Sequence, residues 1–181
     1  MNFLQRLSGI ATETNKYVIK TAGHRAQVVD TRKTTPGLRT LEKYAIRVGG
    51  GRNHRHNLGD GILIKDNHIQ SLVNIGLRLT DIIRNASANA SHTLKVEVEV
   101  EDLDQVKQAL EAGAEILMLD NMGLEEMTQA VKMAQGRAVT EASGGINLDT
   151  VRQVAATGVD LISVGALTHS AKALDVSLDL V

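Results

Sequence analysis

Apolar residues follow two alternating patterns along the chain: short continuous runs, and longer stretches in which they recur every three or four positions. The short runs are typical of buried strands, and the periodic stretches are typical of helices. The first periodic stretch predicts a helix that Asn2 caps and that ends near Gly23. Strands are predicted at Ala26–Asp30, Gly61–Lys65, Leu94–Val100, Ile116–Asp120, Ala138–Ala142 and Asp160–Val164. Further helices are predicted at Leu41–Val48, Ile69–Ala86, Leu103–Ala112, Leu124–Ala134 and Leu148–Ala156.

The later part of the chain repeats one unit. The last four predicted strands begin 22 residues apart, and EAGAEILMLDN (Glu111–Asn121) resembles ATGVDLISVGA (Ala156–Ala166). Repeating strand–helix units predict a parallel sheet with right-handed crossovers. No GxGxxG motif follows the first strand, so the dinucleotide-binding form of an open sheet lacks its signature.

The number of strands then decides between a closed and an open barrel. Six strands are too few for a closed barrel, which needs eight. We therefore predict an α/β fold, an incomplete or open (β/α) TIM-like barrel of about six parallel strands. We expect residues 1–181 to form a single catalytic domain, with residues 1–23 as a leading helix and residues 24–181 as the barrel.

Composition narrows the possible partners. The chain has three aromatic residues, which argues against single-stranded nucleic-acid binding because that relies on stacking. It has no cysteine, which excludes a thiol nucleophile and a cysteine-based zinc site and fits a reducing compartment. The N-terminus lacks the pattern of a secretory signal, and no apolar run approaches the roughly 18 residues of a membrane span. We therefore predict a cytoplasmic protein without nucleic-acid or membrane partners.

The net charge of −1 conceals a strong asymmetry. Residues 24–65 contain nine Lys or Arg against three acids, whereas residues 97–126 contain ten acids against one Lys. If both segments line one cleft, a cationic wall faces an anionic wall, which suits an anion bound together with a divalent metal. The alternative is that most of the acids only solvate helix surfaces.

Functional residues of such barrels lie at the carboxyl ends of the strands and in the loops that follow. The turns Ser143–Gly145 and Val164–Ala166 resemble the phosphate-binding turns of barrels, which use backbone N–H groups. Glu97 and Glu99 share one face of their strand because side chains alternate. The other candidates by this rule are Thr31, Arg32, Lys33, His54, Arg55, Lys65, Asp120, Asn121 and His169.

Each candidate also has a purely structural interpretation. Arg32 and Lys33 could form an exposed turn, and Lys65 could extend outward to solvent. Glu97 and Glu99 could lie on a solvated edge strand, since buried carboxylates need cations or a metal. The two glycine turns could be plain turns. His54 and His56 have metal-ligand spacing, but the sequence offers no evident third ligand for zinc.

Six motifs carry a resemblance to a known family: DTRKTTPGLR, GGGRNHRHNLGDGILIKDNHI, EVEVE, LDN, ASGGI and VGALTHS. At these motifs the chain resembles quinolinate phosphoribosyltransferase, also called nicotinate-nucleotide pyrophosphorylase (decarboxylating), and the resemblance extends from Asn2 to Val181. It implies a glycosyl (pentosyl) transferase of NAD biosynthesis with an open barrel. The implied reaction joins quinolinate to phosphoribosyl pyrophosphate and yields nicotinate mononucleotide, CO₂ and pyrophosphate.

The resemblance also implies roles for the candidates. Arg32, His54, Arg55 and Lys65 would hold the quinolinate carboxylates. Glu99 and Asp120 would hold ribose hydroxyls and Mg²⁺, with no organic cofactor, and Glu97 remains an alternative to Glu99. Lys65, Glu99 and Asp120 would be the catalytic residues. The residues implied for phosphoribosyl pyrophosphate are Thr31, Lys33, Glu99, Asp120, Ser143, Gly144, Gly145, Val164, Gly165, Ala166 and His169.

Two other functions remain open: a transferase for another acceptor, and a non-catalytic module that binds phosphoribosyl pyrophosphate or dimerises with an intact enzyme. The four cationic residues implied for quinolinate are all present, which favours quinolinate over another acceptor. Calorimetry distinguishes the non-catalytic module from the enzyme, because the module would bind phosphoribosyl pyrophosphate with magnesium and would not bind quinolinate.

Full-length members of the family carry an N-terminal domain that covers the partner subunit's site in a dimer and supplies a further arginine to quinolinate. The first predicted helix begins at Asn2, so we expect this polypeptide to act as a homodimer or with a chain that carries that domain. We expect the polypeptide alone to be weakly active or inactive, because an unpaired buried charge costs about 3–5 kcal/mol. A turnover assay with and without the domain tests this expectation, and full turnover without it would contradict it.

Overall fold

The structure is a computed structural model that describes residues 1–179, so residues 180 and 181 of the predicted domain lie outside the described residues. One parallel sheet runs through the fold in the order β1-β6-β5-β4-β3-β2. Within the described residues β1 and β2 are its edges, so the sheet is not closed. The predicted open α/β architecture is confirmed. The strands are β1 (Gln27–Val29), β2 (Ile62–Ile64), β3 (Val96–Val100), β4 (Ile116–Asp120), β5 (Val139–Ser143) and β6 (Leu161–Ser163).

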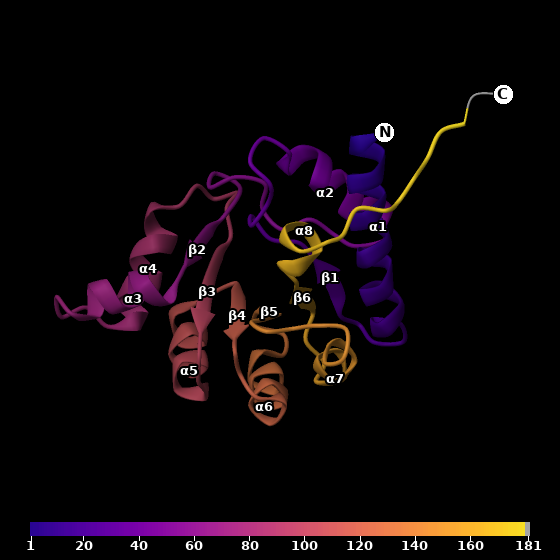
Figure 1. The fold of residues 1–181 in the computed structure, drawn as a ribbon. Coiled ribbons are helices and arrows are strands. Elements are labelled where there is room, and N and C mark those ends of the chain that lie inside the picture. The colour runs from indigo at the N-terminus through magenta and orange to yellow at the C-terminus, as the bar shows by residue number, and fades with distance from the viewer. Residues whose placement is uncertain (180–181) are drawn as a thin grey trace.

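Helices cover the outer side of this curved sheet (Figure 1). α5 packs on β3, α6 on β5 and α7 on β6, while α1 lies against β1, α2 and α7. Among the described helices, none combines the length and the apolar character that a membrane crossing requires. The helices are α1 (Asn2–Thr21), α2 (Arg39–Val48), α3 (Asp66–Val73), α4 (Leu79–Asn89), α5 (Leu103–Ala112), α6 (Leu124–Ala134), α7 (Val151–Ala156) and α8 (Ala166–His169).

Four details of the predicted helices are wrong. Asn2 does not cap the first helix: it is already helical, and the N-cap position is Met1, which makes no side-chain capping hydrogen bond. The predicted helix Ile69–Ala86 is two helices, α3 and α4, because the chain turns at Gly76 with φ +94°. The predicted helix from Leu148 begins three residues later, at Val151, and α8 was not predicted.

The two faces of the sheet have opposite character. Along β3, Val96, Val98 and Val100 are buried in the hydrophobic core that the outer helices cover. Glu97 and Glu99 alternate with them, so they point to the inner face. The register pairs Val98 with Leu117 and continues this apolar row across the sheet. The hydrophobic core therefore lies between the sheet and the helices, and the carboxylates of β3 lie on the inner face.

The segment between α2 and β2 is held at the free edge of β1 by one buried carboxylate. Arg52 bridges Val29 on that edge. Asp30, at the end of β1, is 0% exposed and accepts hydrogen bonds from Lys43 Nζ at 2.5 Å, Asn53 Nδ2 at 2.7 Å and the His54 backbone N–H at 2.8 Å. Lys43 Nζ also donates to the His54 carbonyl oxygen at 3.0 Å. These bonds fix the position of the His54 backbone, from which the side chain extends toward the inner face.

Replacing Lys43 tests this anchor. In Lys43→Met the buried Asp30 carboxylate keeps two donors but loses its cation, which lowers the free energy of unfolding by about 3–5 kcal/mol. Urea denaturation followed by circular dichroism measures the loss. Lys16→Met removes an exposed partner of Glu13 on α1 and serves as the control, with an expected change of about 0–1 kcal/mol. Equal losses in the two variants would contradict the anchoring role of Lys43.

Candidate functional site

A cavity of about 760 Å³ opens at the carboxyl ends of the strands. Its size falls within the range of small-molecule sites. Every site residue assigned from the sequence lines it, so the structure brings all of them together: Thr31, Arg32, Lys33, His54, Arg55, Lys65, Glu99, Asp120, Ser143, Gly144, Gly145, Val164, Gly165, Ala166 and His169. Sequence reasoning missed five further lining residues: Leu63, Met118, Glu141, Ile146 and Ser163. Asn121, a candidate to which no role was given, also lines the cavity.

Strand register explains why residues far apart in the sequence meet here. Glu99 pairs with Met118, and Met118 pairs with Glu141, so these three side chains form one row on the inner face. Asp120 pairs with Ser143 in the row above. β3 lies between β2 and β4 and Glu97 is 5% exposed, which rules out the solvated edge strand considered for these acids.

One wall of the cavity is cationic. The Arg32 loop is fixed by Arg39, whose Nη2 donates to the Arg32 carbonyl oxygen at 3.2 Å. Arg55 Nη1 donates to the Gly61 carbonyl oxygen at 3.0 Å, which holds the side chain across the cavity mouth. Burial and the nearby positive charge of Arg32 lower the pKa of the Arg55 guanidinium. Two guanidinium groups that crowd one another in this way favour an anion between them.

The loop that carries Arg32 and Lys33 is tied to the helices behind it. Glu42 is fully buried and accepts from Thr35 Oγ1 at 2.7 Å and from Arg6 Nη2 at 2.9 Å. Thr168 Oγ1 donates to the Lys33 carbonyl oxygen at 2.6 Å. This loop is therefore held in place at the site. The exposed-turn alternative is wrong for Arg32, which is partly buried, whereas Lys33 is exposed.

Another part of the cavity lining, at the ends of β3 and β4, carries carboxylates. Burial, followed by the nearby charge of Asp120, raises the pKa of Glu99. The two carboxylates end neighbouring strands and both line the cavity. Glu97 is engaged elsewhere, because its carboxylate bonds to His54. The geometry therefore favours Glu99 over Glu97 as the partner of Asp120.

The glycine turn after β5 has a backbone that other residues would not adopt easily. Gly144 has φ +93°, and a Cβ there would lie 2.1 Å from Asn121 Oδ1. Asn121 itself has φ +54° and donates from Nδ2 to Asp120 Oδ2 at 2.7 Å. Gly144 thus allows the β4 and β5 loops to approach one another at the cavity.

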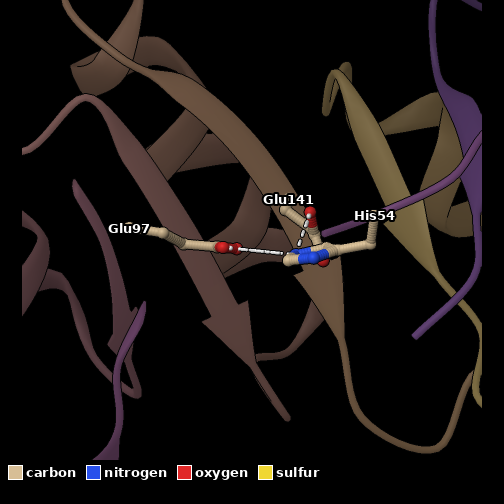
Figure 2. Close-up of side chains that lie close together, drawn as sticks. All are labelled: His54, Glu97 and Glu141. Carbon is tan, nitrogen blue, oxygen red and sulfur yellow. Dashed lines mark hydrogen bonds and ion pairs between the residues drawn. The ribbon is translucent and has the colours of Figure 1, made fainter. Parts of the chain in front are cut away.

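Figure 2 shows a cluster in which the His54 ring points between two acids from the sheet, Glu97 on β3 and Glu141 on β5. His54 Nε2 lies 3.2 Å from Glu97 Oε2 and 3.6 Å from Glu141 Oε2. Glu141 is 1% exposed. Sequence analysis missed Glu141, although the alternation along β5 places it on the same face as the predicted Ser143.

The same three residues offer ligand atoms within 4.8 Å of one another, so a metal must be considered. His56, considered for zinc, is not among them; its Nε2 lies 3.3 Å from Thr40 Oγ1. The His54 Nδ1 atom accepts the Arg55 backbone N–H at 2.8 Å. A neutral imidazole whose Nδ1 is an acceptor carries its proton on Nε2. The Nε2 atom is therefore a donor to the acids and has no lone pair for a metal.

Comparison with known proteins agrees with this geometry. The family described as quinolinate phosphoribosyl transferase, C-terminal domain, matches residues 10–179. The probable nicotinate-nucleotide pyrophosphorylase [carboxylating] of Bacillus subtilis is 46% identical over 180 residues, which are 99% of this chain and 61% of that protein. The quinolinate phosphoribosyltransferase [decarboxylating] 2, mitochondrial, of Nicotiana glauca is 42% identical over 195 residues, 99% of this chain and 55% of that protein.

Solved structures give the same result. NadC from Streptococcus pyogenes superposes with a TM-score of 0.88 at 48% identity, covering 97% of this chain and 60% of that one. The nicotinate-nucleotide pyrophosphorylase from Francisella tularensis superposes with a TM-score of 0.90 at 46% identity, covering 97% and 61%. This chain thus spans about 55–61% of the length of these relatives. The chain belongs to the quinolinate phosphoribosyl transferase family and corresponds to its C-terminal domain.

Proposed function

We propose that this chain provides the catalytic domain of a phosphoribosyltransferase that joins quinolinate to phosphoribosyl pyrophosphate, with loss of CO₂, in NAD biosynthesis. The observation that carries the proposal is the cavity, where guanidinium groups on one wall face two carboxylates on the other beside two glycine turns. A dicarboxylate requires cationic groups, and a phosphorylated sugar bound with a metal requires carboxylates and backbone N–H groups, so a site for both ligands needs all of these. The names of the relatives describe the same reaction.

Quinolinate binds in the cationic part of the cavity. Arg32 and Arg55 supply planar guanidinium groups, which suit carboxylates because they donate two parallel hydrogen bonds. Lys65, which follows β2 directly and whose charge acts on Glu99, adds a third cation to the cavity. His54 lies at the base of this group, where both of its ring nitrogens contact protein atoms. Because both ring nitrogens are engaged, His54 contacts quinolinate through the face or edge of its ring and shapes this part of the cavity.

Phosphoribosyl pyrophosphate occupies the other half. The turns Ser143–Gly145 and Val164–Ala166 surround the 5-phosphate with backbone N–H groups, as barrel phosphate sites do. Lys33 and His169 lie toward the pyrophosphate, and Thr31 is beside them in the same loop. Gly165 brings these groups close together, because a Cβ there would lie 3.2 Å from His169 Nε2 and 3.5 Å from Lys33 Cδ.

A magnesium ion fits the acidic wall. Mg²⁺ prefers oxygen ligands and is commonly held by one or two carboxylates plus substrate phosphates. Glu99 and Asp120 provide two carboxylates on neighbouring strands, and the pKa of Glu99, which burial and then the charge of Asp120 raise, supports a cation at this position. When bound, Mg²⁺ neutralises charge that develops on the leaving pyrophosphate.

The chain's residues act mainly by positioning and electrostatics. Loss of pyrophosphate gives the ribose carbon oxocarbenium character, which the Glu99 and Asp120 carboxylates stabilise. Arg32, Arg55 and Lys65 hold the acceptor so that its ring nitrogen attacks that carbon. The pyridinium ring then accepts the electrons of the breaking C–C bond as CO₂ leaves. No step requires a covalent nucleophile, in keeping with the absence of cysteine.

Residues 1–181 function as one catalytic unit, either as a homodimer or with a chain that supplies the remaining family segment. Exposed apolar residues on α1, Phe3 at 60% and Leu4 at 56%, support association through this helix. We propose the cytoplasm as its location from the cysteine-free sequence, although one relative's name places that protein in mitochondria.

Arg32→Ala tests the quinolinate site. Removing a charge-assisted contact of about 1.5–3 kcal/mol weakens quinolinate binding by about 10- to 100-fold. Isothermal titration calorimetry measures the affinity, and turnover of the chain together with the family's N-terminal segment measures the rate. Arg137→Ala is the matched control because Arg137 is exposed between α6 and β5, at the other end of the strands. Equal affinity in both variants would refute the assignment.

Asp120→Asn tests the metal assignment. The wild-type chain should bind phosphoribosyl pyrophosphate more tightly with Mg²⁺ than with EDTA, and the variant should lose most of that difference. The expected loss is about tenfold or more, the value of one charged contact. Glu111→Gln, an exposed change on α5, is the control and should keep the full magnesium effect. A magnesium effect of wild-type size in Asp120→Asn would place the metal elsewhere.

A further inference from the structure

Two buried side-chain atoms among residues 1–179 make no hydrogen bond: Nε of Arg32 and Oε1 of Glu141. Both residues line the cavity. Buried polar atoms without partners are rare in folded proteins because each carries a desolvation cost. Each atom is therefore available to a polar group of a ligand in the cavity. The Arg32 N–H requires an acceptor, and what Glu141 requires depends on whether its carboxyl group is ionised.

The surroundings of Glu141 contain little positive charge. His54 faces it from the segment before β2, Glu97 from β3 and Ser163 from β6, while Asp30 on β1 lies farther away. The positive charge of Lys43 is already paired with Asp30. Glu97 receives the closer contact from His54 Nε2, at 3.2 Å against 3.6 Å for Glu141. Of the two acids, Glu97 is thus the better supported as an anion.

The cluster of His54, Glu97 and Glu141 can hold one proton beyond that of the neutral imidazole, and the contacts of His54 determine where that proton lies. The proton could make His54 an imidazolium, which places an N–H at Nδ1, or it could make Glu141 a carboxylic acid. The Arg55 backbone N–H already points at Nδ1 from 2.8 Å, and a second donor there would face it directly. Burial lowers the pKa of His54, but the hydrogen bond to Glu97 and the charge of Glu141 raise it overall. The Arg55 N–H at Nδ1 opposes this effect because the imidazolium would place a second donor there, so His54 keeps its one proton on Nε2 and the additional proton belongs to Glu141.

We infer that Glu141 is a neutral carboxylic acid whose O–H donates a hydrogen bond to a carboxylate of the bound aromatic acid, while the N–H of Arg32 Nε contacts the same ligand elsewhere in the cavity. This inference rests on the proposed function for the identity of the ligand. It gives each unpartnered atom a role, since a dicarboxylate offers an acceptor for each of them. An ionised Glu141 would instead repel the dicarboxylate from within the wall that binds it. Glu141 is a specificity-determining residue in this account.

The electrostatics of the site agree with the geometry. Burial, followed by the charge of Glu97, raises the pKa of Glu141 to about 7, with His54 acting in the opposite direction. A donor of this kind is present below that pH and is lost as the pH rises through it. Affinity for the aromatic acid should therefore be highest in mildly acidic solution and should fall in alkaline solution. Quinolinate itself remains a dianion throughout, so its own titration does not produce this change.

Calorimetry with quinolinate across about pH 6 to about pH 9 tests the inference on this chain. The wild-type dissociation constant should increase above about pH 7 by up to about tenfold per pH unit, the slope for loss of one proton. Glu141→Gln keeps a neutral donor of the same shape, so its dissociation constant should stay nearly constant with pH. Glu141→Ala should bind more weakly at acidic pH and also show no slope. A wild-type slope in Glu141→Gln, or no slope in the wild type, would overturn the inference.

Infrared spectroscopy locates the proton without any ligand. The difference spectrum between the wild type and Glu141→Gln should contain the carbonyl stretch of a protonated carboxylic acid at about pH 6, and the band should disappear above about pH 7. Glu111→Gln changes an exposed acid and should give no such band. Absence of the band from the Glu141 difference would overturn the neutral acid. Failure of the proposed function looks different: the band would be present, and quinolinate would not bind at any pH.

Discussion

The buried carboxylate of Asp30 is the interaction on which the site depends. The sheet is open, so its two edge strands do not hold one another, and the long segment from α2 to β2 must span between them. Asp30 fixes that segment by accepting from Lys43, Asn53 and the His54 backbone at the end of β1. A carboxylate with three donors and a paired cation is stable in the interior, whereas one without them is not. The position of the cationic wall follows from this single buried pair.

The alternation of side chains along the strands places the hydrophobic core on one face of the sheet and the acidic site residues on the other. Valines of β3 pack under the outer helices, and the acids between them point inward. The same apolar burial that stabilises the fold therefore holds Glu97 and Glu99 in the cavity. The inner face can carry so many charged groups because they pair with one another or face the opening at the strand ends.

Much of this could be predicted from the sequence, because strands with continuous apolar runs and turns with glycine leave strong local signals. The strand Ile116–Asp120 was predicted to the residue, and every predicted site residue lines the cavity. The break between α3 and α4 was missed because Gly76 lies within a stretch that otherwise keeps helical spacing. Asp30 and Glu141 were missed for another reason: their partners come from distant segments, and nothing in the neighbouring residues identifies them.

Glu141 shows why chemistry at such a site requires the three-dimensional arrangement. In the sequence it is one of many acids, and its ordinary interpretation is an ionised group. In the structure its protonation depends on His54, whose own proton is positioned by the backbone N–H of Arg55, 86 positions earlier in the chain. The cavity thus divides its acids by environment. Glu99 and Asp120 line the cavity, Glu97 is bonded to His54, and Glu141 is the neutral donor that we infer. Under the proposed function, this division is what allows a site rich in carboxylates to bind a dicarboxylate.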